Sequence, residues 1–321
     1  MTRGRGQLPY VAVSIRQRFA NLGRIAIDRD GARHEAFRVW TFKLARRVTP
    51  LVGVDGDGVR FVVSTRETGG VGFFTFVHGA FDEEIMRRLA ALLPDYTRIA
   101  SLRGIRVLEV GANIGTETVS MLVRHGVAHV VAVEPDPANV RLLRANLALN
   151  GVEDRVDVHP IALSDTDGTV AFERSPDNFG DHRVRVGDHG APALLQEGGR
   201  TVTEVPARTL DSLVENREID LAGIDLVWMD VQGHEAHVLG GARALVAAGI
   251  PVLTEYWPYG LARAGALDRF HTTVAEDYAT VVDLRAGSLP AADVATLAAD
   301  YRAERSVAGF PAHTDLLLVP R

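Results

Sequence analysis

The chain has 321 residues, of which 46% are hydrophobic and 24% are charged, and its formal net charge is −6 at pH 7. This is the composition of an ordinary globular protein with a sizeable core. The mildly acidic balance lacks the basic surface that neutralises phosphates, so we expect no nucleic-acid partner. The absence of cysteine excludes thiolate nucleophiles, cysteine-bound zinc and cysteine-held iron–sulfur clusters.

The sequence contains no apolar run of the roughly 18 residues that a membrane span requires. The polar start, residues 1–5, also lacks the apolar segment of a secretory signal. We therefore expect no membrane partner and a cytoplasmic location. Lys43 is the only lysine, and the residues around it are not those of a phosphate-binding loop.

Residues 1–95 predict a small N-terminal α+β cap. Val59–Ser64 and Gly72–Val77 have the composition of paired strands. Asp82–Leu93 has the periodicity of an amphipathic helix, and we expect Pro94 to end it.

Residues 96–321 predict a second, larger domain of the α/β class. Helical stretches at about 115–125, 137–149 and 233–247 separate short β-branched runs, which is typical of a doubly wound, Rossmann-like and mostly parallel sheet. The predicted strands are Ile105–Val110, His129–Glu134, Val156–Leu163, Ile224–Asp230, Pro251–Tyr256, Thr280–Leu284 and Asp315–Val319.

The stretch from Ser164 to Asp220 interrupts this alternation. Thr169–Arg174 and Thr201–Pro206 predict antiparallel strands on either side of a Gly- and Asp-rich segment, Asp177–Gly199. Since long irregular segments in compact domains are commonly functional, we expect Asp177–Gly199 to be a mobile surface loop near a site.

The segment Glu109–Gly115 lies where the first strand of this domain ends and a helix begins. Backbone N–H groups at such a point are unsatisfied and can hold an anionic group. A dinucleotide fingerprint requires Gly-x-Gly-x-x-Gly, but Ala112 and Asn113 follow Gly111, so the spacing fits a ligand without a pyrophosphate. The alternative is a tight turn that binds nothing.

Glu134 ends the next strand, where a carboxylate can accept hydrogen bonds from both hydroxyls of a ribose. Alternatively it is a solvated acid before the helix-starting Pro135-Asp136-Pro137. Taken together, the glycine loop and this acid describe a site for a nucleoside with a small charged tail.

These motifs resemble the FkbM family of S-adenosylmethionine-dependent methyltransferases over about residues 60–320. The matching segments are Leu108–Gly115, Val133–Pro135, Asn146 with Asn150-Gly151, Ala162–Asp165 with Gly168, Thr209–Asp211, and Met229–Glu235 with Leu239 and Gly241-Ala242. The resemblance implies a class I methyltransferase fold with seven strands, the last antiparallel. It also implies methylation of a hydroxyl oxygen on a small molecule, such as a natural product or sugar.

The resemblance further implies where the cofactor lies. The glycine loop would hold the methionine moiety, Glu134 the ribose, and the Ala162-Leu163 region the adenine. The implied cofactor-binding residues are Glu109, Gly111, Ala112, Asn113, Gly115, Thr116, Glu134, Pro135, Ala162, Leu163 and Asp230.

Methyl transfer from a sulfonium is an in-line displacement, so the protein aligns the acceptor oxygen and helps to remove its proton. Asp230 ends the fourth strand, and His234 follows within one turn. An imidazole with an ordinary pKa near 6.5 can accept a proton near neutrality, so we predict His234 as the base. Glu255, at the end of the fifth strand, is a second candidate base or an orienter of the acceptor.

Other interpretations of these residues stay open. Asp230 can instead cap the following helix, and Asp230 with Glu255 can hold Mg²⁺, although we favour a site without a metal. We expect Glu235 and His237 to be solvated helix positions. Three aromatic residues can wall an acceptor pocket or belong to the core: Tyr256, Trp257 and Tyr259.

Two rival functions also remain. A nicotinamide-dependent oxidoreductase is disfavoured by Ala112-Asn113 in the glycine loop. A catalytically inactive binding protein on the same fold is kept open by Gln232, because the family commonly has Glu there. The acceptor's identity and the oligomeric state do not follow from the sequence.

Overall fold

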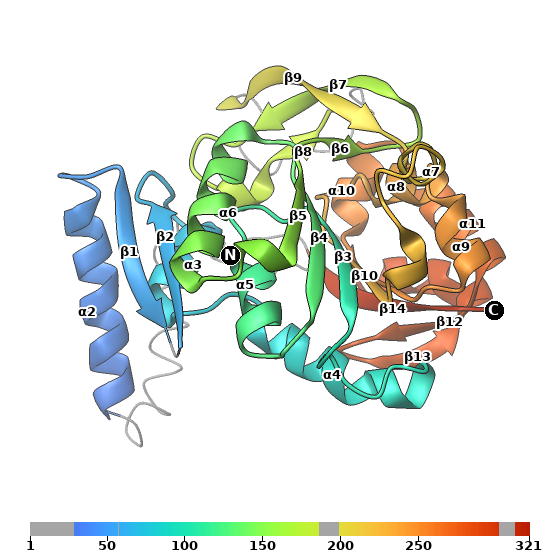
Figure 1. Ribbon diagram of the computed structural model, residues 1–321, viewed down its shortest axis with the longest axis horizontal. Helices are drawn as coiled ribbons and strands as arrows, with labels where there is room; N and C mark the ends of the chain where they lie inside the picture. Colours follow the sequence, from blue (N-terminus) through green and yellow to red (C-terminus); the bar gives the residue numbers. More distant parts are fainter. Residues whose placement is uncertain (1–28, 57, 186–198, 302–311) are drawn as a thin grey trace, which may run out of the picture.

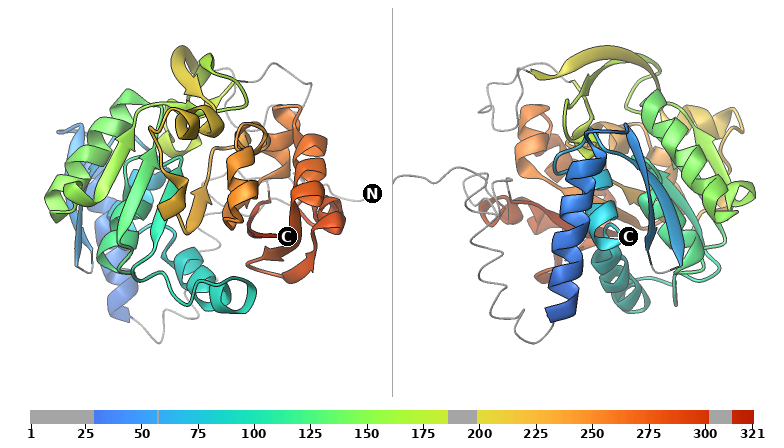
Figure 2. Two further views of the ribbon diagram at one scale, coloured as in Figure 1. Left: turned by 45° about the vertical axis from the view of Figure 1, so that its right-hand side comes forward. Right: turned by 90° about the vertical axis from the view of Figure 1, so that its left-hand side faces the viewer.

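The computed structural model describes residues 29–56, 58–185, 199–301 and 312–321 (Figure 1). A large twisted sheet lies at the centre, with helices packed on both of its faces (Figure 2). A helix and a hairpin from the N-terminal part lie at one side, and a smaller sheet lies over one edge. Among the helices in these ranges, none has the length and apolarity needed to cross a membrane.

The central sheet has eight strands in the order β13-β12-β14-β11-β10-β3-β4-β5. The five strands from β11 to β5 are parallel, and β14 lies antiparallel between β11 and β12. The bounds are β3 Arg106–Val110, β4 His129–Val133, β5 Val156–His159, β10 Leu226–Met229, β11 Val252–Tyr256, β12 Tyr278–Asp283, β13 Gly287–Pro290 and β14 Thr314–Pro320. The doubly wound class I methyltransferase sheet is therefore confirmed, and β13 adds a short eighth strand at its edge.

The residues of these strands alternate between two cores, one on each face of the sheet. On one face Leu108 and Val227 pack under the C-terminal helices, and on the other Val107 and Leu226 belong to a second apolar cluster. Successive side chains of a strand point to opposite faces, so a strand buried on both sides is apolar throughout.

The crossover helices begin and end at residues with clear capping roles. α6 (Pro137–Asn150) has the Asp136 carboxylate at its start, which accepts two backbone N–H groups, and Gly151 in the left-handed region at its end. α5 (Thr116–Val123) begins after Gly115, which also has a positive φ.

The predicted helix 233–247 is two helices, α8 (Glu235–Gly240) and α9 (Arg243–Ala248). They separate at Gly241, where the chain passes so close to the Ser164 carbonyl that a Cβ would stand 2.1 Å from its oxygen. Two successive glycines weaken the helix at the point where this close approach is needed.

The predicted strand Val156–Leu163 is also wrong in its extent. β5 ends at His159, and β6 (Ala162–Leu163) leaves for a second sheet with the order β6-β9-β7-β8. Pro160 separates the two because it has no N–H with which to continue the ladder.

In the second sheet, β7 (Gly168–Arg174) and β9 (Thr201–Arg208) pair antiparallel, as predicted. Between them the structure describes a 3₁₀ turn, η2 (Phe179–Asp181), and β8 (Arg183–Val184). The rest of the predicted mobile loop, residues 186–198, lies outside the described residues, so its mobility stays a prediction.

The N-terminal part contains α2 (Arg29–Ala45), which lies beside the antiparallel hairpin of β1 (Leu51–Gly56) and β2 (Val59–Ser64) (Figure 2). The predicted partner strand Gly72–Val77 is instead a helix, α3 (Val71–His78). The Glu67 carboxylate accepts the N–H groups of Gly72 and Phe73, at 3.2 Å for Phe73, and so satisfies the first turn of this helix.

The helix α4 (Glu83–Tyr96) continues past Pro94, contrary to the prediction. Pro94 removes one hydrogen bond in the last turn, while Met86, Leu89 and Leu93 bury a continuous face that keeps the helix in place. These residues join Val107 in one apolar cluster. The domain division at residue 95 stays a prediction.

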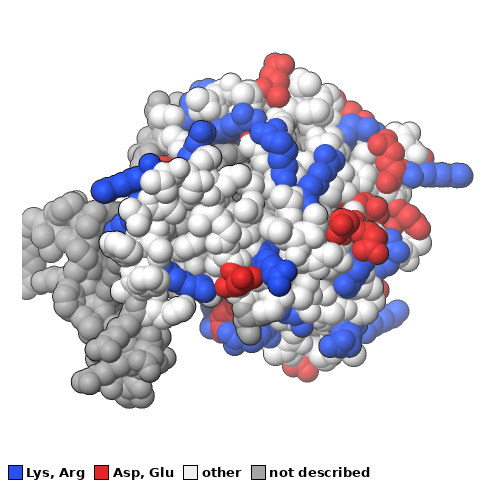
Figure 3. All heavy atoms as spheres, turned by 60° about the vertical axis from the view of Figure 1, so that its left-hand side comes forward, with Lys and Arg blue, Asp and Glu red and all other residues white. Residues whose placement is uncertain are grey.

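The surface beside the hairpin carries charges of both signs around a broad uncharged area (Figure 3). Large apolar side chains are exposed on α2 and after it: Phe37, Trp40, Leu44, Val48 and Leu51.

Candidate functional site

A cavity of about 770 Å³, its open mouth included, lies at the carboxyl ends of β3, β4 and β10. Most of the predicted cofactor residues line it: Glu109, Gly111, Asn113, Glu134, Pro135, Ala162, Leu163 and Asp230. Ala112, Gly115 and Thr116 are buried and are not among its lining residues. We refer to this space as the first cavity.

The tips of β3 and β4 meet through Asn113 and Glu134. The Asn113 backbone N–H donates to Glu134 Oε2 over 3.0 Å, and the Asp136 N–H donates to Glu134 Oε1 over 2.8 Å. Glu134 is 5% exposed, and burial raises its pKa to about 7. The carboxylate is thus held rigidly against the cavity wall.

The glycine loop does not offer free N–H groups, so that prediction is wrong. The N–H groups from Gly111 to Gly115 already donate within the protein. Their acceptors are the carbonyls of Val133 and Ala112 and the side chains of Glu134 and Asn113. The loop is therefore fixed by hydrogen bonds within the protein. It forms part of the cavity wall without offering free N–H donors to a ligand.

Gly111 shows why that shape requires glycine. Its φ is +97°, and a Cβ there would stand 1.9 Å from the carbonyl oxygen of Asp230. The absence of a side chain lets the tips of β3 and β10 touch beside the cavity.

Two further carboxylates lie in the wall of the first cavity, Glu109 and Glu117. Thr118 Oγ1 donates to Glu109 over 2.5 Å, and Thr116 Oγ1 donates to Glu117 over 2.6 Å. Burial raises the pKa of both groups, of Glu117 to about 7. Asp230 lines the same wall, and a positively charged ligand group would favour the ionised forms of these acids.

The second sheet and its turn cover the first cavity with residues that the sequence did not single out: Phe172, Phe179, Gly180, His182, Arg183 and Val184. Asn113 Nδ2 donates to the Phe179 carbonyl over 3.0 Å, which ties this cover to the glycine loop. The one signal for this cover in the sequence was the expectation that the loop Asp177–Gly199 lies near a site.

A second cavity of about 860 Å³ adjoins the first. It contains titratable side chains from five separate regions of the chain: Asp82, Asp230, Glu255, Arg285, His313 and Asp315. Asp230 and Gln232 line both cavities, so they stand at the junction.

Gln232 joins the two predicted acids at this junction. Its Nε2 donates to Asp230 Oδ1 over 2.7 Å and to Glu255 Oε2 over 3.0 Å. Burial raises the pKa of Glu255 well above its usual range, and the nearby Asp230 charge adds to this; burial also raises the pKa of Asp230. The residue that precedes α8 is His234, and the Asp230 carboxylate is bound by Gln232 instead. Asp230 therefore does not cap this helix.

His234 lines the first cavity but is only 3% exposed. Its Nε2 lies 3.0 Å from Ser164 Oγ, and its ring stacks on His237 with 4.4 Å between centroids. Burial, followed by the neighbouring His237, lowers the pKa of His234 to about 3, so the imidazole is neutral. Its role as the base stays a prediction.

Glu235 is fully buried, so its predicted exposure is wrong. Its Oε1 accepts the N–H groups of Val231 and Gly233 over 3.2 and 3.1 Å, which closes the turn after β10. Tyr256, Trp257 and Tyr259 are buried and line neither cavity, and Tyr256 belongs to the core.

Comparisons with known proteins relate the chain to methyltransferases. Residues 109–262 match the model of the methyltransferase FkbM domain. The chain is 30% identical over 159 residues to the 2-O-methyltransferase NoeI of Sinorhizobium fredii (strain NBRC 101917 / NGR234), covering 47% of this chain and 62% of that protein. It is 28% identical over 153 residues to the methyltransferase sdnD of Sordaria araneosa, covering 42% and 59%. The matches thus span about three-fifths of each relative.

Among solved structures, methyltransferase FkbM from Methylobacillus flagellatus KT is similar, with 18% identity and a TM-score of 0.40. The match covers 67% of this chain and 43% of that one.

Proposed function

Because the chain belongs to the FkbM family of methyltransferases, we propose that it transfers the methyl group of S-adenosylmethionine to a hydroxyl oxygen of a small molecule. The observation that supports this most strongly is the hydrogen bond of 3.0 Å between Asn113 and Glu134. It brings a glycine-bearing strand tip and an acidic strand tip into one cavity, as an adenosyl ligand requires.

The residues of the first cavity fit this ligand. Glu134 faces the cavity as an acceptor for two ribose hydroxyls, and Ala162 with Leu163 offers an apolar surface for the adenine. The positive charges of the sulfonium and the ammonium group would favour the ionised forms of Glu109 and Glu117 in the cavity wall, and those carboxylates would in turn attract the ligand. A pyrophosphate would lack this attraction, which counts against a nicotinamide cofactor.

We assign the acceptor to the second cavity, where Asp230 and Glu255 face the incoming hydroxyl. When bound, S-adenosylmethionine would supply a methyl group on a sulfonium: a C–O bond to the acceptor would form as the C–S bond breaks, and the electron pair would return to sulfur as a neutral thioether. The hydroxyl proton passes to a carboxylate oxygen of Asp230 or Glu255.

His234 remains the other candidate to accept the hydroxyl proton. Its Nδ1 is buried without a hydrogen-bond partner in the described part of the chain, and it lines the cofactor side of the junction.

Two measurements test this function. Titration calorimetry with S-adenosylmethionine and with NADH should show binding of the first ligand alone. Incubation with a radiolabelled methyl donor and a panel of sugar and polyol hydroxyls should then show transfer. Binding of NADH alone would replace the proposal with an oxidoreductase, and donor binding without transfer to any acceptor would favour the inactive binding protein.

A further inference from the structure

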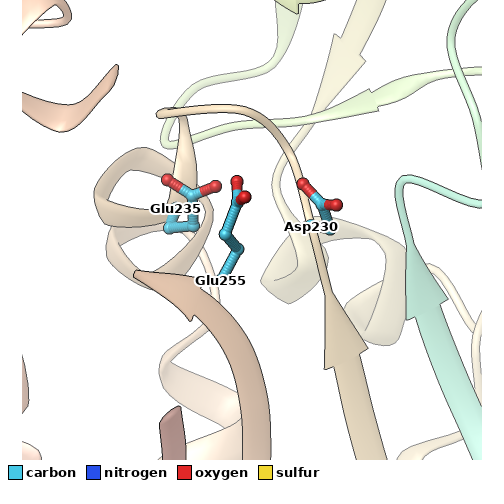
Figure 4. Close-up of side chains that lie close together, drawn as sticks. All are labelled: Asp230, Glu235 and Glu255. Carbon is cyan, nitrogen blue, oxygen red and sulfur yellow. The ribbon is translucent and has the colours of Figure 1, made fainter. Parts of the chain in front are cut away.

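Three carboxylates converge behind the junction of the two cavities (Figure 4). Asp230 follows β10, Glu235 begins α8, and Glu255 lies in β11. One oxygen from each lies within 4.8 Å of the other two. Three acids brought so close together repel one another unless protons or a cation neutralise them.

Among the described residues, Glu235 contributes an unpartnered carboxylate oxygen to this cluster. Its Oε1 accepts two backbone N–H groups, whereas its Oε2 is buried and has no hydrogen-bond partner within the described ranges. An unpaired buried carboxylate oxygen is costly, because it has lost its water without gaining a partner. The side chain nevertheless stands beside Glu255 (Figure 4).

We propose that Asp230, Glu235 and Glu255 form a binding site for a hard divalent cation of the Ca²⁺ and Mg²⁺ class. Carboxylate oxygens are the ligands that these ions prefer, whereas zinc prefers nitrogen and sulfur. Two oxygens on opposite sides of Ca²⁺, each at about 2.4 Å, stand about 4.8 Å apart. The cluster therefore has the width of a Ca²⁺ site and has to contract slightly for Mg²⁺.

Gln232 adds a fourth oxygen to this site. Its amide nitrogen now bridges Asp230 and Glu255, at 2.7 and 3.0 Å. Turning the amide by half a rotation places Oε1 where Nε2 stands, and an amide oxygen is a good ligand for Ca²⁺. The side chain can thus hold the two acids together without an ion and bind the ion when it is present.

The site is placed to act on the acceptor, a step that rests on the proposed function. Asp230 and Glu255 also line the second cavity, so the cation would be reached by hydroxyl oxygens bound there. A divalent cation favours neighbouring hydroxyls or other oxygen pairs, which selects diol-like acceptors.

The test is cation binding to the full chain after treatment with EDTA, measured without an acceptor. Calorimetry with CaCl₂, MgCl₂ and MnCl₂ in turn should reveal one site. Tb³⁺ luminescence, sensitised by Trp228 of β10, which lines the first cavity together with Asp230, should support it. Glu235→Gln keeps an oxygen for the Val231 and Gly233 N–H groups and should weaken binding by about tenfold or more, as should Glu255→Gln. Asp157→Asn, which changes an exposed acid outside the cluster, should not weaken it.

Two variants of Gln232 test the cation site even if Glu235→Gln or Glu255→Gln fails to fold. Gln232→Glu should bind the cation more tightly, and Gln232→Met, which lacks the amide oxygen, should bind it several times more weakly. A melting curve in EDTA for each variant verifies that it folds.

Absence of binding by all three cations, or equal binding by wild type and Glu235→Gln, would overturn the cation site. S-adenosylmethionine binding is measured in parallel, so that its loss would count against the proposed function instead.

Discussion

The Asn113 backbone N–H lies 3.0 Å from Glu134 Oε2 and ties the tip of β3 to the tip of β4. The Asp136 N–H binds the other oxygen of the same carboxylate. Both donors are backbone N–H groups, so the carboxylate geometry on which the proposed ribose site depends is built into the turns after two neighbouring strands. Such preorganisation lowers the entropy lost on binding.

Removing this carboxylate is expected to weaken the binding of S-adenosylmethionine. Glu134→Ala should cost about 1–3 kcal/mol of binding free energy, because charge-assisted hydrogen bonds to the ribose are lost. Calorimetry measures the change in Kd, and Glu153→Ala, which alters an exposed acid away from the cavity, is the control. Equal dissociation constants for wild type and Glu134→Ala would remove Glu134 from the site.

The affinity for S-adenosylmethionine should also depend on pH through Glu134. Burial raises the pKa of Glu134 to about 7 in the unliganded protein, so below that pH the group is mostly protonated. Since the ribose hydroxyls need an ionised acceptor, affinity should fall by about tenfold per pH unit below pH 7 and level off above it. The slope is measured from Kd values between about pH 5.5 and 8.5. It should disappear in Glu134→Gln, and a slope that persists there would belong to another group.

Glu67 is expected to make the fold less stable as pH rises. Burial raises its pKa from 4.5 to about 7, so the folded chain binds a proton more tightly than the unfolded chain. The stability that this group contributes is complete below about pH 4.5 and is lost as pH rises through about 7. In denaturant titrations Glu67→Gln should reduce the difference between pH 5 and pH 8 by about 1–3 kcal/mol. An unchanged difference would contradict the prediction.

Gly111→Ala should destabilise the protein more than a matched change at Gly104. Both glycines have positive φ, +97° and +82°, so both alanine variants share the backbone strain. A Cβ at Gly111 would also stand 1.9 Å from the Asp230 carbonyl oxygen, whereas nothing lies within 4 Å of one at Gly104. We expect about 1 kcal/mol for Gly104→Ala and about 2–4 kcal/mol for Gly111→Ala, measured by chemical denaturation. Equal losses would mean that β3 and β10 separate easily.

Replacement of Asp230 and of His234, two of the candidate proton acceptors, should rank them. Asp230→Asn is expected to lower kcat by about 100-fold, because the carboxylate at the junction of the cavities is lost. His234→Ala should lower kcat less and should keep its affinity for S-adenosylmethionine. Single-turnover rates measure this order, and the reverse order would make His234 the base.

Much of the central sheet could be predicted because its strands are buried on both faces. Continuous apolar runs such as Leu226–Met229 have few other interpretations in an alternating α/β pattern. The motifs at the strand tips could also be predicted, because a glycine loop followed by an acid at the end of the next strand is typical of a site for a nucleoside. Both kinds of signal are local in the sequence.

The errors arose where specific side-chain contacts, rather than composition, decide the outcome. The segment Gly72–Val77 reads as a strand by composition, yet Glu67 caps it as a helix. Glu235 looks like a solvated acid, yet its carboxylate closes the turn after β10. The aromatic cover from Phe172 and Phe179 depends on how the second sheet folds back, which no spacing in the sequence records.

Glu67 has one more consequence. The Oε2 atom of Glu67 caps α3, and its Oε1 accepts the Phe179 N–H over 3.3 Å. One buried acid thus joins α3 to the turn that covers the first cavity. A fragment that starts at Arg98 would contain every strand of the central sheet but would lack this contact. The N-terminal segment thus contributes to the wall of the first cavity, through Val71 and Phe81.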